Sequence, residues 1–95
     1  MRNYEIMYII KANLETGVTK EIVDNFNTIL TQNSSTILEF KEIGLKDLAY
    51  EIQHAKKGYY VWLKVNANAE TIAEFNRVVG ITEDVIRYIV VKEGE

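Results

Sequence analysis

Four segments of the chain combine apolar side chains with the short periodicity of β-strands. Residues 3–10 are apolar at alternate positions, and further apolar side chains stand between them, which is typical of a strand covered on both sides or nearly so. Residues 36–43 are rich in β-forming side chains, residues 59–65 show the clearest strand pattern, and residues 85–91 are largely β-branched. The pattern therefore predicts four strands.

Glycines mark where the middle strands change course. Gly44 interrupts the second predicted strand and is interpreted as a β-bulge. The residues that follow, 45–57, fit either a long extension of that strand or a loop. Gly58 then opens the third strand. The chain has no proline, so the boundaries rest on periodicity and glycine alone.

Two further segments show helical spacing. Residues 14–32 and residues 69–79 each place apolar side chains three or four positions apart, which puts them on one stripe of a helix. These side chains are Val18, Ile22, Phe26, Ile29 and Leu30 in the first segment and Ile72, Phe75, Val78 and Val79 in the second.

The ends of the two helices carry residues that favour caps. Asn13 or Thr16 is expected to cap the start of the first helix, and residues 33–35 are expected to end it. Asn68 is the expected N-cap of the second helix, and Gly80 is expected just beyond its last turn.

The predicted order is βαββαβ. Two right-handed crossovers of this kind give an α+β, ferredoxin-like fold, with a four-stranded antiparallel sheet of order 4-1-3-2 and both helices on one face. The first and third strands are expected at the centre, running parallel to each other. A length of 95 residues predicts one domain, residues 1–95.

With both helices on one face, the other face should be polar, yet the alternation predicts apolar side chains there. The expected core side chains are Tyr4, Ile6, Tyr8, Ile10, Val61, Leu63, Val65, Tyr88 and Val90. The expected outward side chains are Met7, Ile9, Tyr60, Trp62, Ile89 and Val91, flanked by Lys64 and Arg87. Such a patch is typical of a binding surface, and on this sheet it is also where RNA bases stack. The alternative is that lysine side chains and segment 45–57 fold over the patch.

Charge narrows the choice of partner. The net charge is −3, which counts against nucleic acid as the only partner, because phosphate contact rewards a basic surface. Acidic residues gather in the predicted helices and the tail, whereas the segment from Lys41 to Lys64 holds five lysines. A local basic stripe on an acidic protein is consistent with this distribution.

Several other classes are disfavoured by what the sequence lacks. Without cysteine there is neither a disulfide framework nor a thiolate metal site, and no apolar run approaches a membrane span. The N-terminus has no signal-peptide pattern, so the expected compartment is the cytoplasm. His54 is the only histidine and is interpreted as a surface loop residue without chemistry. We therefore expect no enzyme, no cofactor and no metal.

Two rival functions share the predicted fold. An acylphosphatase-like enzyme needs a glycine-rich phosphate loop after the first strand, and residues 10–14 contain no glycine. A small-molecule-sensing module of a metabolic enzyme should show a glycine-lined turn at the same place. The aromatic outer face favours a macromolecular partner over both.

Four short motifs, spread over nearly the whole chain, are similar to those of the bacterial small-subunit ribosomal protein S6 family. They are Met1-Arg2-x-Tyr4-Glu5, Gly44-x-x-x-Leu48-Ala49-Tyr50-x-Ile52, Gly58-Tyr59-Tyr60, and Arg87-Tyr88-Ile89-Val90-Val91. The resemblance implies the same fold and a structural role in the small ribosomal subunit. It also implies a heterodimer with ribosomal protein S18, and binding of that pair to the central domain of 16S rRNA during assembly.

The resemblance and the outer-face pattern together assign roles to individual residues. The expected RNA ligands are Arg2, Tyr4, Lys46, Lys56, Lys57, Lys64 and Arg87. The expected protein-partner surface is Leu48, Tyr50, Tyr60, Trp62, Ile89 and Val91. No membrane and no small-molecule substrate is expected.

Overall fold

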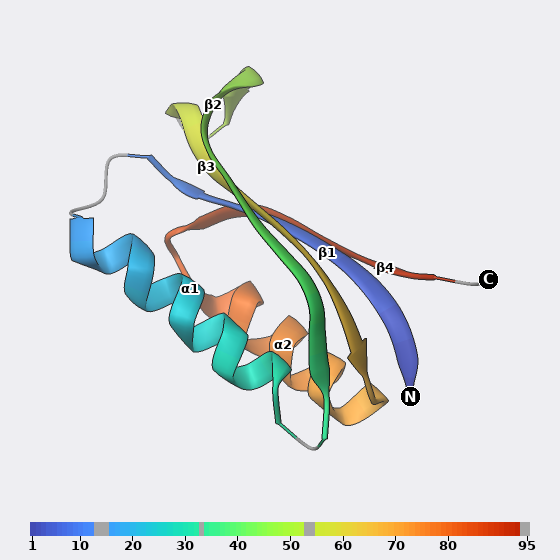
Figure 1. Cartoon of the computed structure of the whole chain (residues 1–95). Helices are drawn as coiled ribbons and strands as arrows, with labels where there is room; N and C mark the ends of the chain where they lie inside the picture. The colour runs from blue at the N-terminus through green and yellow to red at the C-terminus, as the bar shows by residue number, and fades with distance from the viewer. Residues whose placement is uncertain (13–15, 33, 53–54, 94–95) are drawn as a thin grey trace.

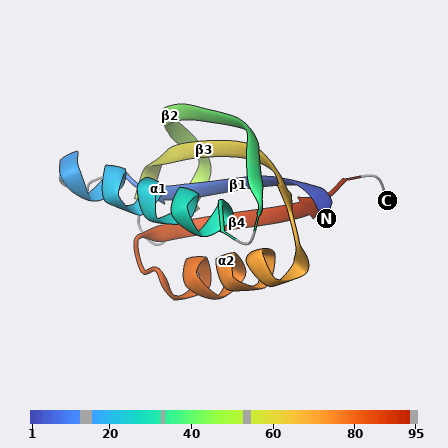
Figure 2. The same cartoon turned by 60° about the horizontal axis from the view of Figure 1, so that its bottom comes forward.

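The computed structural model describes residues 1–12, 16–32, 34–52 and 55–93, and in it a strand–helix–strand unit occurs twice (Figure 1). The elements are β1 (Arg2–Lys11), α1 (Thr16–Leu30), β2 (Thr36–Ile52), β3 (Ala55–Ala67), α2 (Ala69–Ile81) and β4 (Val85–Lys92). The four strands form one antiparallel sheet of order β2-β3-β1-β4, and both helices cover the same face of it (Figures 1 and 2). The ferredoxin-like fold and its strand order are confirmed.

The predicted direction of the two central strands was wrong. β1 and β3 are antiparallel, with Ile6 opposite Leu63 and Tyr8 opposite Val61. The reason lies in the connections. A strand–helix–strand crossover returns the chain in its original direction, whereas the tight β2–β3 hairpin reverses it. The third strand must therefore oppose the first.

The core lies between the sheet and the helices, and three aromatic rings meet at its centre. Tyr8 of β1 contacts Phe26 of α1 edge-on with ring centroids 5.0 Å apart, and Phe26 contacts Phe75 of α2 at 5.5 Å. All three side chains are fully buried. Edge-to-face pairs at such distances add stability beyond the area that they bury. These rings therefore join the sheet to both helices.

Around the rings, most of the predicted core is confirmed. Ile6, Ile10, Val61, Leu63, Val65, Ile29, Leu30, Ile72 and Val79 are buried, and Tyr4, Ile22, Val78 and Val90 pack against them while partly exposed. Val23, which the predicted stripe omitted, is also buried. Tyr88 was predicted to be a core side chain, and this prediction was wrong, because the side chain is 38% exposed. β4 is an edge strand, so this ring has a neighbouring strand on one side only.

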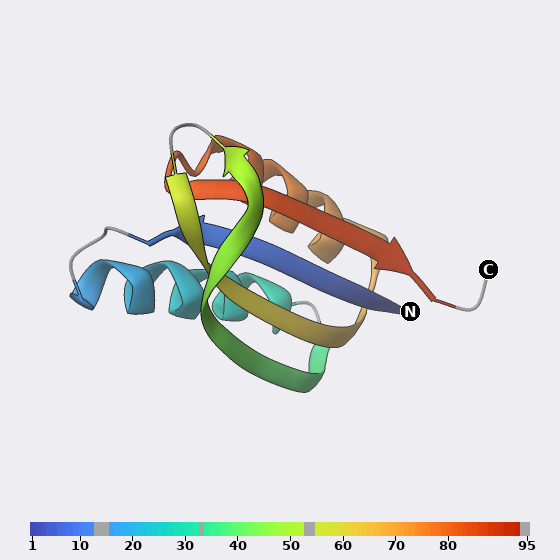
Figure 3. The ribbon, with the colours of Figure 1, turned by 90° about the horizontal axis from the view of Figure 1, so that it is seen from above.

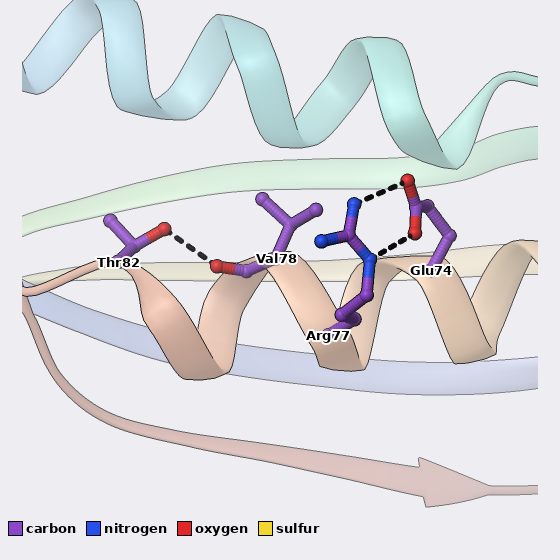
Figure 4. Close-up of polar contacts among 4 residues, drawn as sticks. All are labelled: Glu74, Arg77, Val78 and Thr82. Atoms are coloured by element: carbon purple, nitrogen blue, oxygen red, sulfur yellow. Dashed lines mark hydrogen bonds and ion pairs between the residues drawn. The ribbon is translucent and has the colours of Figure 1, made fainter.

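The ends of α2 test the capping predictions. Asn68 is the N-cap, and its side-chain oxygen accepts a hydrogen bond from the backbone N–H of Thr71 at 2.9 Å. The prediction for Gly80 was wrong, because the helix continues to Ile81 and Thr82 is the C-cap. The Thr82 hydroxyl donates to the carbonyl oxygen of Val78 at 2.7 Å (Figure 4). This hydroxyl bond accompanies a backbone bond from Thr82 to Val79, and the pair closes the last turn without a glycine.

The outer surface of α2 carries an ion pair that points into solvent. Arg77 donates to both carboxylate oxygens of Glu74, at 2.7 and 2.9 Å (Figure 4). The hydrogen bonds from Arg77 lower the pKa of the Glu74 carboxyl and raise the pKa of the guanidinium. Because the pair is exposed, it contributes little to stability.

The start of α1 falls partly outside the described residues. Asn13 lies there, and Thr16 is the first residue of the helix. The helix ends at Leu30, a little before the predicted stop, and Ser34 adopts a φ of 65° in the turn that follows. The hydroxyl of buried Ser35 then donates to that of Thr71 at 3.1 Å, which ties this turn to the start of α2.

We expect Leu30→Ala to lower the free energy of unfolding by about 2–5 kcal/mol, because Leu30 is fully buried and its truncation leaves a cavity between α1 and the sheet. Urea unfolding followed by circular dichroism measures this change. Ile81→Ala is the control, because Ile81 is 69% exposed and should cost less than about 0.5 kcal/mol. Equal losses in the two variants would contradict the assignment of the core.

Candidate nucleic-acid and protein interface

The sheet face opposite the helices, called here the open face, is covered at one end by the chain itself. β2 does not stop near Gly44 but continues to Ile52, and β3 begins at Ala55, three residues before the expected Gly58. Where it is described, segment 45–57 therefore extends both strands. Register shifts occur on either side of Phe40, and Gly44 has a φ of 96° beside the second shift, so the predicted bulge is confirmed. Beyond it, the distal hairpin, defined as residues 45–52 and 55–58, bends across β1 and β4 on the open face (Figure 3).

The hairpin touches the sheet through a glycine. A Cβ at Gly58 would collide with the side chain of Ile9 and would lie 3.4 Å from Cδ2 of Leu48. The close approach leaves Ile9 only 8% exposed. The prediction that Ile9 belongs to the exposed patch was therefore wrong. It does point away from the helices, but the hairpin buries it.

A second contact joins the hairpin to the edge strand. Arg87 of β4 donates from Nη1 to the hydroxyl oxygen of Tyr50 at 2.9 Å. The two residues are 37 positions apart in sequence, and both remain exposed. The distal hairpin thus folds over one end of the face, as the alternative interpretation allowed for segment 45–57, and leaves the other end open.

The uncovered end is apolar. The apolar patch consists of Met7, Trp62, Ile89 and Val91, and Ile89 and Val91 are 49% and 51% exposed. A hollow of about 130 Å³ lies among these four side chains, and a larger one of about 310 Å³ lies between Met7 and Arg87. The ammonium of Lys41 sits 5.4 Å from the centre of the Trp62 ring. The patch therefore combines an aromatic anchor with grooves for apolar side chains.

The predicted RNA ligands do not form one cluster. Lys46, Lys56 and Lys57 lie on the distal hairpin, on the same side as Arg87, whereas Arg2 and Lys64 lie toward the other end of the sheet. Arg2 and Ile9, which pairs with Arg87, are seven residues apart along β1, or roughly 23 Å.

Several of these cations already have acidic neighbours. Lys64 pairs with Glu93 at 3.3 Å, and Lys57 approaches Asp47 at 4.0 Å. Tyr4 packs against the core on the helix side of the sheet, whereas Arg87 lies on the open face. Among the described residues, Arg87 has no carboxylate partner, and its exposed position beside the distal hairpin leaves it able to meet a phosphate.

A separate groove of about 540 Å³, lined by both apolar and charged side chains and not indicated by the sequence, lies on the helix side between α1 and the sheet. Tyr59 donates a short hydrogen bond to Glu42 there, and this bond raises the pKa of Tyr59 to about 12. The nearby hydroxyl of Tyr8 is buried without a hydrogen-bond partner among the described residues, and burial raises its pKa as well. No group of side chains in the described ranges could hold a metal ion.

These observations define a class: a ferredoxin-like module whose open sheet face carries an apolar patch at one end and, at the other, an arginine held by a tyrosine hydroxyl. Comparison with known proteins specifies it further. The family model "Ribosomal protein S6" matches residues 3–92. The chain therefore belongs to the ribosomal protein S6 family, and the resemblance found in its sequence is confirmed.

Curated relatives match over the full length. The chain is 56% identical to "Small ribosomal subunit protein bS6" of Acholeplasma laidlawii and 54% identical to the protein of the same name from Shouchella clausii, each over 95 residues and 100% of both chains. The crystal structure of 30S ribosomal protein S6 from Thermotoga maritima superposes with a TM-score of 0.90, covering 97% of this chain and 87% of that one at 22% identity. The last comparison supports the fold.

The family is one of structural ribosomal proteins, so the predictions of a small-subunit ribosomal protein and of a chain that is not an enzyme are confirmed. Neither rival class, the acylphosphatase-like enzyme or the small-molecule sensor, agrees with this membership. Within the described part of the chain, no helix has the length and apolar character to cross a bilayer.

We expect Gly58→Ala to loosen the distal hairpin, because the added methyl group cannot share the space of the Ile9 side chain. The free energy of unfolding should fall by about 1–3 kcal/mol. Trypsin should also cleave faster after Lys56 and Lys57. Urea unfolding and timed proteolysis measure the two effects.

Gly17→Ala is the matched control, because a Cβ at Gly17 meets no atom within 4 Å and alanine favours a helix. It should be as stable as the parent chain or slightly more so. A Gly58→Ala variant with unchanged stability and unchanged cleavage would show that the hairpin does not depend on this approach.

Proposed function

We propose that this protein, acting as a single domain of 95 residues, binds the central domain of 16S rRNA as a heterodimer with ribosomal protein S18 during assembly of the small ribosomal subunit. The observation that carries the proposal is the division of the open face. One end is the uncovered apolar patch. The other end carries Arg87 and the distal hairpin, which contributes Lys46, Lys56 and Lys57.

The apolar patch supports a protein partner. Contiguous apolar surface with a tryptophan is costly to leave in water and is typical of a macromolecular interface. Trp62 is partly exposed on the central strand β3, Met7 lies opposite it on β1, and Ile89 lies on the far side of Met7 on β4. The hollow among these side chains suits an aliphatic or aromatic anchor from the partner.

The charge balance supports a basic partner. With a net charge of −3, the chain alone gains little from counterion release on RNA. Among the described residues, four lysines are near carboxylates, which reduces the free positive charge further. A small basic protein held on the apolar patch would supply the missing cations beside Arg87 and the hairpin lysines.

We expect Trp62→Ala to weaken the complex with S18 by about 2 kcal/mol or more, because the ring is the largest apolar group of the patch. Isothermal titration calorimetry against S18 measures the loss. Ile81→Ala, which removes an exposed apolar side chain from α2, should leave the affinity unchanged. If the folded Trp62→Ala protein binds S18 as the parent does, the partner uses another surface, and the 48–52 segment becomes the next candidate.

We expect Arg87→Ala to weaken binding of the assembled pair to rRNA by about 1–3 kcal/mol, and to reduce the salt dependence by about one unit of slope, because one phosphate contact is lost. Filter binding at several salt concentrations measures both quantities. Arg77→Ala on the outer surface of α2 is the matched control and should change neither. Equal effects of the two substitutions would point to a general loss of charge and away from a site at Arg87.

A further inference from the structure

The hydrogen bond between the distal hairpin and β4 gives Tyr50 a role that the sequence did not suggest. Tyr50 of β2 and Arg87 of β4 are 37 positions apart in sequence and meet at 2.9 Å on the open face. Both side chains remain accessible, since Tyr50 is 62% exposed and Arg87 is exposed as well. A contact that bridges two elements yet stays open to solvent leaves both groups able to reach a ligand.

We infer that Tyr50 is a positioning residue for RNA, which holds the guanidinium of Arg87 in place and joins it in a two-donor site for one backbone phosphate. This inference rests on the proposed function, in which Arg87 binds rRNA. It places Tyr50 with the RNA ligands, where the sequence pattern had suggested the protein-partner surface.

The chemistry of the two groups fits a phosphate. A guanidinium has five N–H donors, and Tyr50 accepts a bond from only one of its nitrogens. The phenol oxygen accepts that bond and still carries its own O–H, which is free to donate. Among the residues described, Arg87 has no carboxylate partner, so none of them neutralises its charge.

The hairpin supplies the rigidity that positioning requires. Leu48 and Gly58 pack where Ile9 is buried, and Tyr50 follows Leu48 by two residues on the same strand. An arginine on an edge strand otherwise samples many rotamers, and ordering it on binding costs affinity. With the hydroxyl of Tyr50 already bound to it, part of that cost is met before RNA arrives.

The test is a double-mutant cycle measured on the assembled S18 pair with an rRNA central-domain fragment. Tyr50→Phe removes only the hydroxyl and should weaken binding roughly 3- to 10-fold, the range of one hydrogen bond. Arg87→Ala should weaken it about tenfold or more. Because part of the effect of Tyr50 acts through Arg87, the loss in the double variant should be clearly smaller than the sum of the two single losses.

Three further readouts separate positioning from a general structural effect. The salt slope should fall for Arg87→Ala but stay unchanged for Tyr50→Phe, which removes no charge. The affinity for S18 and the melting temperature should be unchanged by Tyr50→Phe. Tyr88→Phe is the matched control, because it makes the same chemical change on the helix side of β4 and should leave RNA binding unaltered.

The outcomes distinguish this inference from the proposed function. If Arg87→Ala weakens RNA binding but Tyr50→Phe does not, the positioning role is wrong and the proposed function stands. Additive losses would mean that Tyr50 binds independently, which also overturns the role. If Tyr50→Phe weakens binding to S18, Tyr50 belongs to the protein-partner surface and the inference is wrong. If Arg87→Ala leaves RNA binding unchanged, both the inference and the assignment of Arg87 fail.

Discussion

The three-ring contact among Tyr8, Phe26 and Phe75 is the constraint from which the rest of the structure follows. It joins β1 to both helices at once, so neither helix can move to the opposite face without breaking it. A four-stranded sheet has two faces, and this contact commits all helical cover to one of them. The open face is thus a consequence of where the aromatic core lies.

The distal hairpin covers part of the apolar surface on the open face. Two glycines make this possible, each for a different reason. Gly44 adopts a positive φ beside a register shift, which bends β2, and Gly58 lets the hairpin approach Ile9 more closely than any side chain would allow. The chain therefore covers one end of its own apolar surface and leaves the end around Trp62 for a partner.

Electrostatics reinforces this division of the open face. The chain is acidic overall, and carboxylates of its own lie near some of its surface lysines. Arg87 differs because its described hydrogen bond goes to a neutral hydroxyl, so its charge remains available. A protein of this kind is suited to bind RNA as one half of a pair, with apolar contacts to the partner and a few well-placed cations toward the nucleic acid.

Local patterns in the sequence determined the elements and their order. Burial of an apolar stripe repeats every two residues in a strand and every three or four in a helix, so the strands, both helices and the fold class could be predicted. The cap at Asn68 depends on an N–H only three residues away, and it too was predictable. The family motifs identified the family for the same reason, because they are short and continuous.

What the tertiary structure alone decided depends on residues far apart in sequence. The burial of Ile9 requires the hairpin to cross β1, and the Tyr50–Arg87 bond spans 37 positions. The apolar pattern of residues 3–10 allowed cover on both faces of that strand, but no local periodicity says which distant segment supplies the cover or which side chains meet there. The end of α2 was also not predictable from the local sequence. Gly80 is a residue type that usually ends a helix, but α2 continues past it because Thr82 makes hydrogen bonds to the last turn.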